Sequence, residues 1–339
     1  MGVALCLLSA ACFGAMAIFG KLAYDAGVSP GALLLARFAL AAVVLGIVLL
    51  VRPGLRRSAS SSPPPEAVGP STMTRGRVLA IAVGLGAIGY AMQASLFFSA
   101  LQVMDTSLLA LIFYTYPVMV TVVAVLVGRD RLTPARGAAL AAASGGILLV
   151  LLGAGGISFH PGGALLAFAS AITYTVYILV ADIVVHRLAP VVLAALVMTG
   201  AAGTLGARAM LTGGVDLDFG VSGWFWLACI AGVSTVVAML TFFAGLKRIG
   251  PSTVAVLSTL EPVVTSALAG LVLHESLTPV QLAGGALVLS SVAVLQLRPT
   301  GTHRKDSSMP SASDQLARGN HHISGPAREG RSEPAVPAP

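Results

Sequence analysis

The chain has 339 residues, of which 56% are hydrophobic and 10% are charged, and its mean hydropathy is +0.91. A soluble globular domain carries about 25% charged residues, so this composition argues against one and indicates a protein that lies mostly in lipid. The net charge of +7 does not predict a nucleic-acid partner, because the basic residues lie in short connections between apolar runs and in the C-terminal tail.

Apolar runs able to cross a hydrocarbon core of about 30 Å recur along the chain. We therefore expect an all-α membrane protein. Its ten transmembrane helices are expected at residues 3–20, 31–51, 78–100, 107–127, 136–154, 162–181, 189–210, 222–244, 253–273 and 279–297. The first apolar run continues past Ala15–Ala17, which imitates a signal-peptide cleavage site, so we expect this helix to be retained.

Three kinds of segment depart from this pattern. Residues 52–77 are a loop rich in Arg, Ser and Pro, and the connections near 156–161 and 212–221 are short and Gly-rich. Residues 301–339 contain Pro, Gly and Ser with scattered charge. Because such a segment cannot bury enough apolar surface to fold, we expect a disordered cytoplasmic tail there.

The basic residues indicate how the helices are oriented. Of the 20 Lys and Arg residues, 17 lie in alternate connections and in the tail, and the other three are Lys21, Arg37 and Arg208. Cytoplasmic connections of membrane proteins carry the excess of Lys and Arg. We therefore expect a multi-pass protein of the cell membrane, with both its N- and C-termini in the cytoplasm.

The second half of the chain repeats the first. A shift of 145 places aligns residues 97–134 with residues 242–279 without a gap. Pro117 then falls on Pro262, and each aligned segment ends in Leu-Thr-Pro. The first two helices of each half align less well and at a larger offset, and the long loop at 52–77, which belongs to the first half alone, accounts for the different offset.

Each half holds five expected helices, so we expect two repeats, at residues 1–154 and 155–300. Because five is odd, the second copy must enter the membrane from the opposite side. Inverted repeats of this kind hold their substrate sites near the bilayer midplane, at the interface of the two halves. The pattern predicts a secondary transporter that moves a small solute by alternating access.

Motifs in both halves resemble a known family. The first helix carries Phe13-Gly14 followed by Lys21, and the paired motifs are Tyr116-Pro117-Val118, Glu261-Pro262-Val263 and the two Leu-Thr-Pro endings. Over residues 3–297 these features resemble the EamA-domain branch of the drug/metabolite transporter superfamily, whose members commonly carry Trp-Gly in place of Phe-Gly. The resemblance implies ten helices and secondary transport, often export, of metabolites, amino acids or drug-like solutes.

Catalytic, metal and cofactor motifs are not visible. The three cysteines lie singly in apolar runs, and His274-Glu275 begins an H-E-x-x-H zinc pattern in which position 278 is Thr. We expect no metal and no cofactor, and we expect the chain not to be an enzyme. An intramembrane enzyme and a channel or scaffold remain the alternatives. The expected partners are the lipid bilayer and a small-molecule substrate, and a homodimer is a candidate assembly.

Two charges lie deep inside expected helices. Glu261 lies nine residues into the ninth, roughly 12 Å from its cytoplasmic end, and shares a helical stripe with Ser258 and Thr265. A carboxylate at that depth either takes part in function or pairs with another helix to fix packing. Arg37 could hold a substrate carboxylate, pair with Glu261 as a gate, or extend to the interface.

Prolines and aromatic residues complete the candidate site. Pro117 and Pro262 each remove a helical hydrogen bond, so we expect helix breaks at both. Uncharged polar residues share one face of the third helix and another of the sixth. The candidate substrate-binding or coupling residues are Glu261, Arg37, Tyr116, Ser258, Thr265, Tyr90, Gln93, Tyr174 and Tyr177.

Overall fold

The computed structural model describes residues 1–56, 74–101, 103–104, 106–128, 133–152, 160–272 and 278–297. These residues belong to one compact unit, Met1–Arg298, and the remaining Pro299–Pro339 form a second unit outside the described residues. The tail expected at residues 301–339, most of the loop at 52–77 and the His274-Glu275 pair therefore lie outside the described part.

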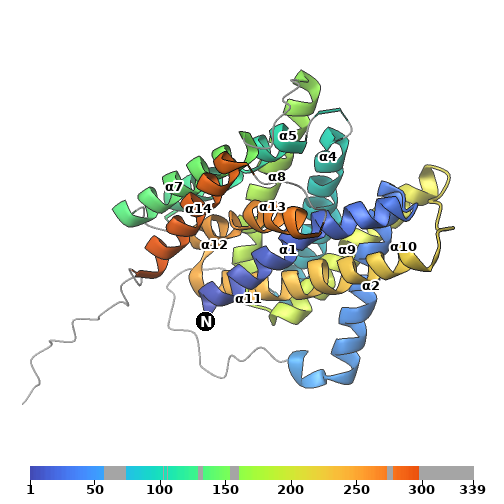
Figure 1. The fold of residues 1–339 in the computed structure, drawn as a ribbon. Helices are drawn as coiled ribbons and strands as arrows, with labels where there is room; N and C mark the ends of the chain where they lie inside the picture. Colours follow the sequence, from blue (N-terminus) through green and yellow to red (C-terminus); the bar gives the residue numbers. More distant parts are fainter. Residues whose placement is uncertain are drawn as a thin grey trace, which may run out of the picture. The chain divides into compact units, whose positions relative to one another are not determined.

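The described residues form helices and no β-strand, which confirms an all-α fold (Figure 1). The α-helices are α1 (Gly2–Asp25), α2 (Pro30–Val51), α3 (Arg75–Gly84), α4 (Ala91–Leu101), α5 (Thr106–Phe113), α6 (Tyr116–Leu126), α7 (Pro134–Leu152), α8 (Pro161–Val185), α9 (Pro190–Leu211), α10 (Val221–Ala231), α11 (Ala238–Ile249), α12 (Pro251–Ser258), α13 (Glu261–Val272) and α14 (Pro279–Leu297). A short 3₁₀ helix, η1, and two π-helical segments, η2 and η3, span Pro53–Arg56, Leu85–Tyr90 and Gly232–Val237.

Seven helical stretches in the described part are long and apolar enough to cross a membrane. Four are the single helices α1, α2, α8 and α9, and three are compound stretches that join α3 to α4, α10 to α11, and α12 to α13. Shorter apolar helices, Tyr116–Leu126, Gly137–Leu152 and Pro279–Ser291, occupy the other three expected spans. The chain is thus a multi-pass membrane protein.

The main differences from the expected boundaries lie at helix ends. The first expected helix stops at residue 20, but α1 continues to Asp25, and α8 runs to Val185 rather than residue 181. Hydropathy locates only the apolar part of a helix, and the polar turn that follows keeps its backbone hydrogen bonds at the membrane surface.

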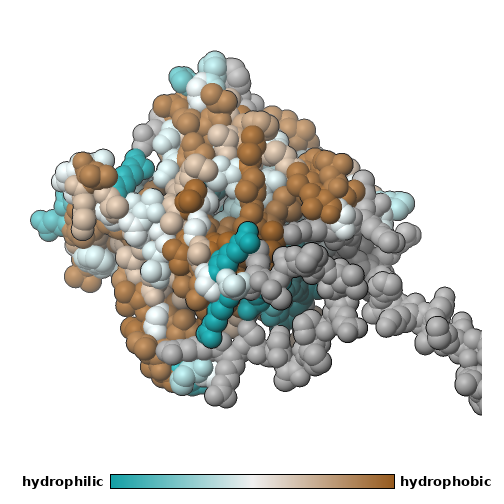
Figure 2. Space-filling model, turned by 180° about the vertical axis from the view of Figure 1, so that it is seen from behind, coloured by the Kyte–Doolittle hydropathy of each residue, from teal (hydrophilic) through white to brown (hydrophobic). Residues whose placement is uncertain are grey.

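The outward face of α8 shows how the surface of the bundle is built. Its exposed side chains include Leu165, Phe168, Ile172 and Val176, which are 70%, 45%, 46% and 54% exposed. Their spacing of three or four residues puts them on one side of the helix. Broad bands of apolar residues also cross the face drawn in Figure 2. Such surface is stable against lipid and would be unfavourable in water.

Prolines and polar caps determine where several helices begin. Pro30, Pro161, Pro190 and Pro251 each occupy the first position of a helix, where the missing N–H has no intrahelical partner to lose. The Ser29 side-chain oxygen accepts a hydrogen bond from the backbone N–H of Ala32, at 3.2 Å, and caps α2.

Small residues let helices approach closely. Helices α7 and α14 cross side by side (Figure 1), with Gly146 and Gly284 facing each other. A Cβ on Gly146 would come within 2.7 Å of the Gly284 carbonyl oxygen. Gly200 of α9 packs in the same way against the carbonyl of Val83 on α3. Close packing of this kind is what holds helices together in lipid, where hydrophobic burial drives association little.

This packing predicts a difference between two glycines of α9. Gly200→Ala should lower stability by about 1–3 kcal/mol, because the new methyl group would overlap the Val83 carbonyl. Gly203→Ala is the matched control, since no atom lies within 4 Å of its Cβ position. Thermal unfolding in detergent measures both, and equal melting temperatures for the two variants would contradict the prediction.

Candidate functional site

A cavity of about 130 Å³ lies among the central helices. It is lined from α1, α2, η2, α4, α5, α8 and α13 by Phe13, Met16, Arg37, Tyr90, Gln93, Ala94, Phe97, Phe98, Phe113, Tyr174 and Glu261. We call it the Arg37–Glu261 cavity. Five of the residues proposed from the sequence therefore share one space: Arg37, Glu261, Tyr90, Gln93 and Tyr174.

Arg37 is turned into the protein, with 3% of its surface exposed. Nη1 contacts the Met16 sulfur at 2.7 Å, and Nη2 donates a hydrogen bond of 3.0 Å to the Tyr90 hydroxyl. The guanidinium carbon also lies 4.5 Å from the centre of the Phe38 ring, where the negative face of the ring attracts a cation. The side chain therefore does not extend to the membrane interface.

The contacts to Met16 and Tyr90 do not use all the N–H donors of Arg37. Its Nε has no hydrogen-bond partner among the described residues. A guanidinium has five N–H donors, and the contacts to Met16 and Tyr90 occupy two of them. Because these contacts do not go to Glu261, the cavity presents a cation and a carboxyl group that a bound solute could reach separately.

Glu261 is the first residue of α13 and is half-buried. The α12–α13 helix is interrupted just before it, at Thr259–Leu260. The N-terminus of a helix carries a partial positive charge that stabilises a carboxylate. Tyr114, from the corresponding break between α5 and α6, interacts with this carboxyl group.

Gln93 and Ser170 join two walls of the cavity. Gln93 Nε2 donates to Ser170 Oγ at 3.2 Å, and Ser170 Oγ donates to the Gln93 carbonyl oxygen at 3.1 Å. These bonds link α4 to α8, so Gln93 both lines the cavity and holds its walls together.

Aromatic rings form the side of the cavity next to α8. Tyr174 lies 4.8 Å from Tyr116, 5.5 Å from Phe113 and 5.8 Å from Tyr177, between ring centres. Tyr177 in turn stacks on Tyr90 at 5.5 Å. Contacts of this geometry stabilise by about 0.5–1.5 kcal/mol each beyond their buried area, which makes this wall stiff.

Four proposed residues lie outside the cavity lining. Tyr116 and Tyr177 are 1% and 2% exposed and form the layer behind Tyr174. Ser258 Oγ donates to the Val254 carbonyl, and Thr265 Oγ1 donates to the carbonyls of Gly14 and Glu261.

The expected polar stripe of Ser258, Glu261 and Thr265 is therefore not one surface of the cavity. The break at Thr259–Leu260 interrupts the helical register between Ser258 and Glu261. The hydroxyl groups of Ser258 and Thr265 each donate to backbone carbonyl oxygens, as is usual for Ser and Thr inside a membrane helix.

Pro117 and Pro262 lie directly after the interruptions. Regular helical structure is interrupted at Tyr114–Thr115 and at Thr259–Leu260. Each proline takes the second position of the helix that follows. A proline there loses no hydrogen bond, because the first N–H groups of a helix have no intrahelical acceptor. The expectation that each proline removes a helical hydrogen bond is therefore wrong, although a helix interruption precedes both prolines.

Sequence reasoning missed Ala94, Phe98, Phe113 and Tyr114. Phe98 belongs to the repeated Phe-Phe pair, and Phe113 and Tyr114 belong to an aromatic run before Pro117. The repeated pair and the run were visible in the sequence, but they do not indicate which ring faces a cavity and which faces a neighbouring helix.

The fold and the cavity together define a multi-pass membrane protein with an internal, solute-sized site. The sequence profile of the EamA-like transporter family matches residues 1–152 and 161–297. The chain belongs to the EamA-like transporter family, which confirms the resemblance seen in its motifs. The family indicates a membrane transporter rather than an enzyme.

Two individual proteins are similar to this chain. The "Uncharacterized transporter YcbK" of Bacillus subtilis (strain 168) is 26% identical over 317 residues, which cover 90% of this chain and 96% of that protein. A solved crystal structure superposes with a TM-score of 0.71, at 21% identity, and the match covers 87% of this chain and 96% of the other. At that identity the superposition shows a shared fold.

The contact between Tyr90 and Arg37 predicts a difference between two tyrosines. Tyr90→Phe should lower stability by about 1–3 kcal/mol, because it removes the acceptor of a buried guanidinium. Tyr177→Phe is the matched control, since the buried Tyr177 hydroxyl has no hydrogen-bond partner in the part of the chain that the structure describes. Thermal unfolding of the two variants in detergent measures the difference. If Tyr177→Phe is the less stable variant, the hydrogen bond from Arg37 to Tyr90 does not stabilise the protein as predicted.

Proposed function

We propose that the chain is a secondary transporter that moves a small solute across the cell membrane by alternating access. One observation carries the proposal: the Arg37–Glu261 cavity holds a buried cation and a carboxyl group at membrane depth, beside two interrupted helices. Charged groups inside a membrane are costly and mark substrate or ion pathways. We propose export as the direction, on the resemblance alone.

The positions of the interruptions support two repeats, at residues 1–154 and 155–300. The break at Tyr114–Thr115 and the break at Thr259–Leu260 are 145 residues apart when their first residues are compared. This is the offset that aligns the two halves of the sequence. The π-helical segments η2 and η3 also fall in corresponding compound helices.

Helix packing supports the inverted arrangement. Helix α1 packs on α11 and α13, and its counterpart α8 packs on α4 and α6. Helices α2 and α9, and likewise α7 and α14, pack on each other as counterparts would across an axis. If the three shorter apolar helices are counted as spans, the described residues contain ten spans, which we assign to two sets of five.

The interruptions and π-helical segments supply places where a helix can bend. A π turn leaves backbone groups out of the regular ladder and is frequent at functional sites. Here Thr235 Oγ1, within η3, donates to the Ile230 carbonyl at 3.0 Å, and Thr204 Oγ1 of α9 donates at 2.8 Å to the carbonyl of Ala87, within η2. We propose that movement at these points exposes the cavity to one side of the membrane and then to the other.

The alternatives differ in what the cavity must do. An intramembrane enzyme needs a reacting pair of groups, and a channel needs a continuous path. Arg37 anchored on Tyr90 fits neither role as well as it fits a binding site for an anionic or zwitterionic solute. A homodimer is compatible with the exposed apolar faces and is part of the proposal only as an assembly to be measured.

The distribution of basic residues predicts the topology. Reporter fusions after Arg77 and within the tail should be cytoplasmic, and a fusion near His160 should be external, because 17 of 20 Lys and Arg residues lie on one side. Paired alkaline phosphatase and fluorescent-protein fusions measure this. A tail and a His160 region on the same side would contradict the ten-helix arrangement.

The cavity predicts the effect of neutralising Glu261. Glu261→Gln keeps the size and most hydrogen bonds of the side chain but removes the charge, so counterflow of a metabolite pool in proteoliposomes should fall by about tenfold or more. Asp25→Asn, at the exposed end of α1 and outside the cavity, is the matched control and should transport normally.

A double variant tests whether the two charges act together. Arg37→Gln combined with Glu261→Gln should be less impaired than the sum of the single changes, because both line one cavity. Each variant needs a melting temperature beside its transport rate. Normal transport by folded Glu261→Gln would overturn the proposed role of this residue.

A further inference from the structure

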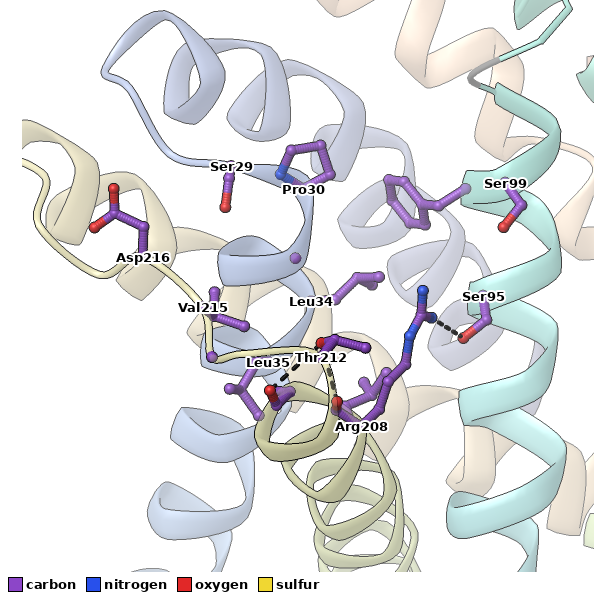
Figure 3. A pocket seen from close by; sticks show the side chains of 15 residues that line it. Ser29, Pro30, Leu34, Leu35, Ser95, Ser99, Arg208, Thr212, Val215 and Asp216 are labelled. Carbon is purple, nitrogen blue, oxygen red and sulfur yellow. Dashed lines mark hydrogen bonds between the residues drawn. The ribbon is translucent and has the colours of Figure 1, made fainter.

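A second cavity, of about 290 Å³, shares the lining residue Phe98 with the first, and Figure 3 shows it from close by. It lies where the start of α2, the C-terminal part of α4 and the end of α9 meet the connection that follows α9. Its charged lining residues are Arg208 and Asp216. We call it the Arg208 cavity; it shares Phe98 with the Arg37–Glu261 cavity, but neither Arg37 nor Glu261 lines it.

Arg208 spans this cavity from one helix to another. It lies in the last turn of α9, and its Nη1 donates to Ser95 Oγ on α4 at 3.4 Å. Figure 3 shows the side chain reaching from α9 toward Ser95. An arginine that only complemented the dipole of α9 would have no need of a partner on α4. A guanidinium has five N–H donors, and the hydrogen bond to Ser95 uses one of them.

Three other polar residues of the lining, Ser29, Thr212 and Asp216, make hydrogen bonds within the protein. Ser29 Oγ caps α2, and Thr212 Oγ1 donates to the carbonyl of Arg208. Asp216 Oδ1 accepts from the backbone N–H of Asp218, and Figure 3 places Asp216 on the opposite side of the pocket from Arg208. The lining therefore offers one cationic end and a separate acidic end.

Apolar side chains line the cavity between the cationic and the acidic end. Leu34, Leu35 and Leu205 line the cavity, and so does Phe98. Phe98 also lines the Arg37–Glu261 cavity, so this single ring borders both spaces. A solute passing from one cavity to the other would leave one arginine, cross the ring of Phe98 and meet a second arginine.

We propose that the Arg208 cavity is a second binding site, for small organic acids that carry one carboxylate on an apolar body. Arg208 and the Ser95 hydroxyl hold the carboxylate, and Leu34, Leu205 and Phe98 pack on the body. A planar guanidinium binds a carboxylate through two parallel hydrogen bonds, which is a geometry that a neutral amide cannot match. This proposal adds a substrate class to the proposed transport function. A role of the site in transport rests on that proposed function.

Protection of an introduced cysteine tests binding without any transport assay. Ser99 lines the Arg208 cavity, so Ser99→Cys, made together with Cys229→Ala, places one accessible thiol beside the site. The native Cys6 and Cys12 are buried, at 1% and 7% exposure, and should not react. The reagent is N-ethylmaleimide, which is neutral, and the probes are benzoate and its neutral isostere benzamide.

Benzoate should slow the labelling of the introduced thiol, and benzamide at the same concentration should not. Adding Arg208→Gln should raise the benzoate concentration that gives half-protection by about tenfold or more, because a charge-assisted pair is lost. Arg208→Lys, which keeps the charge without the fork, should fall between. Arg248→Gln is the matched control, because Arg248 is exposed at the end of α11, lines neither cavity, and donates to the Ala244 carbonyl.

Equal protection by benzoate and benzamide would overturn the proposal, as would benzoate protection that Arg208→Gln leaves unchanged. If Arg208→Gln does not fold, the comparison of benzoate with benzamide and the Arg208→Lys variant still test whether Arg208 binds the carboxylate. Benzoate protection without counterflow in proteoliposomes would retain the site while refuting the proposed transport function. Transport that depends on Glu261, without any protection by benzoate, would refute the second site and support the proposed transport function.

Discussion

Every backbone N–H and C=O group inside the hydrocarbon must find a partner, because an unpaired one costs several kcal/mol there. The two helix interruptions are therefore the most constrained features of this protein. Each is followed by a proline that needs no acceptor, and each contains a threonine that binds back to the chain. Thr115 Oγ1 donates to the Ile112 carbonyl at 2.7 Å, and Thr259 Oγ1 donates to the Val256 carbonyl at 2.6 Å.

This local solution has an electrostatic consequence. Ending α12 and starting α13 inside the bundle places a new helix N-terminus at membrane depth, with Glu261 as its first residue. The partial positive charge of that terminus stabilises a carboxylate that would otherwise be costly to bury. In the first half of the chain the equivalent position holds Tyr116, which packs into the aromatic wall. The two halves thus share a backbone device and use it for different side chains.

The two charges are held with different stiffness. Arg37 is fixed by Met16, by the ring of Phe38 and by Tyr90, the last residue of η2. A change in the π-helical segment would move Tyr90 and release one of these contacts. Glu261 depends on a helix end and on Tyr114, at the other interruption. In the proposed mechanism, movement at the irregular points of the helices would therefore alter the contacts of both charges.

The sequence by itself determined the membrane environment, the helical fold and the expected spans, because hydropathy and proline positions are local properties. It also singled out Arg37, Glu261, Tyr90, Gln93 and Tyr174, since a polar residue inside an apolar run is visible without neighbours. Only the tertiary structure decided which of the candidates meet. Ser258 and Thr265 turn to backbone acceptors, while Phe98 borders two cavities. Rotations at a helix break and contacts between distant helices decide these matters, and a periodic pattern read along one helix contains neither.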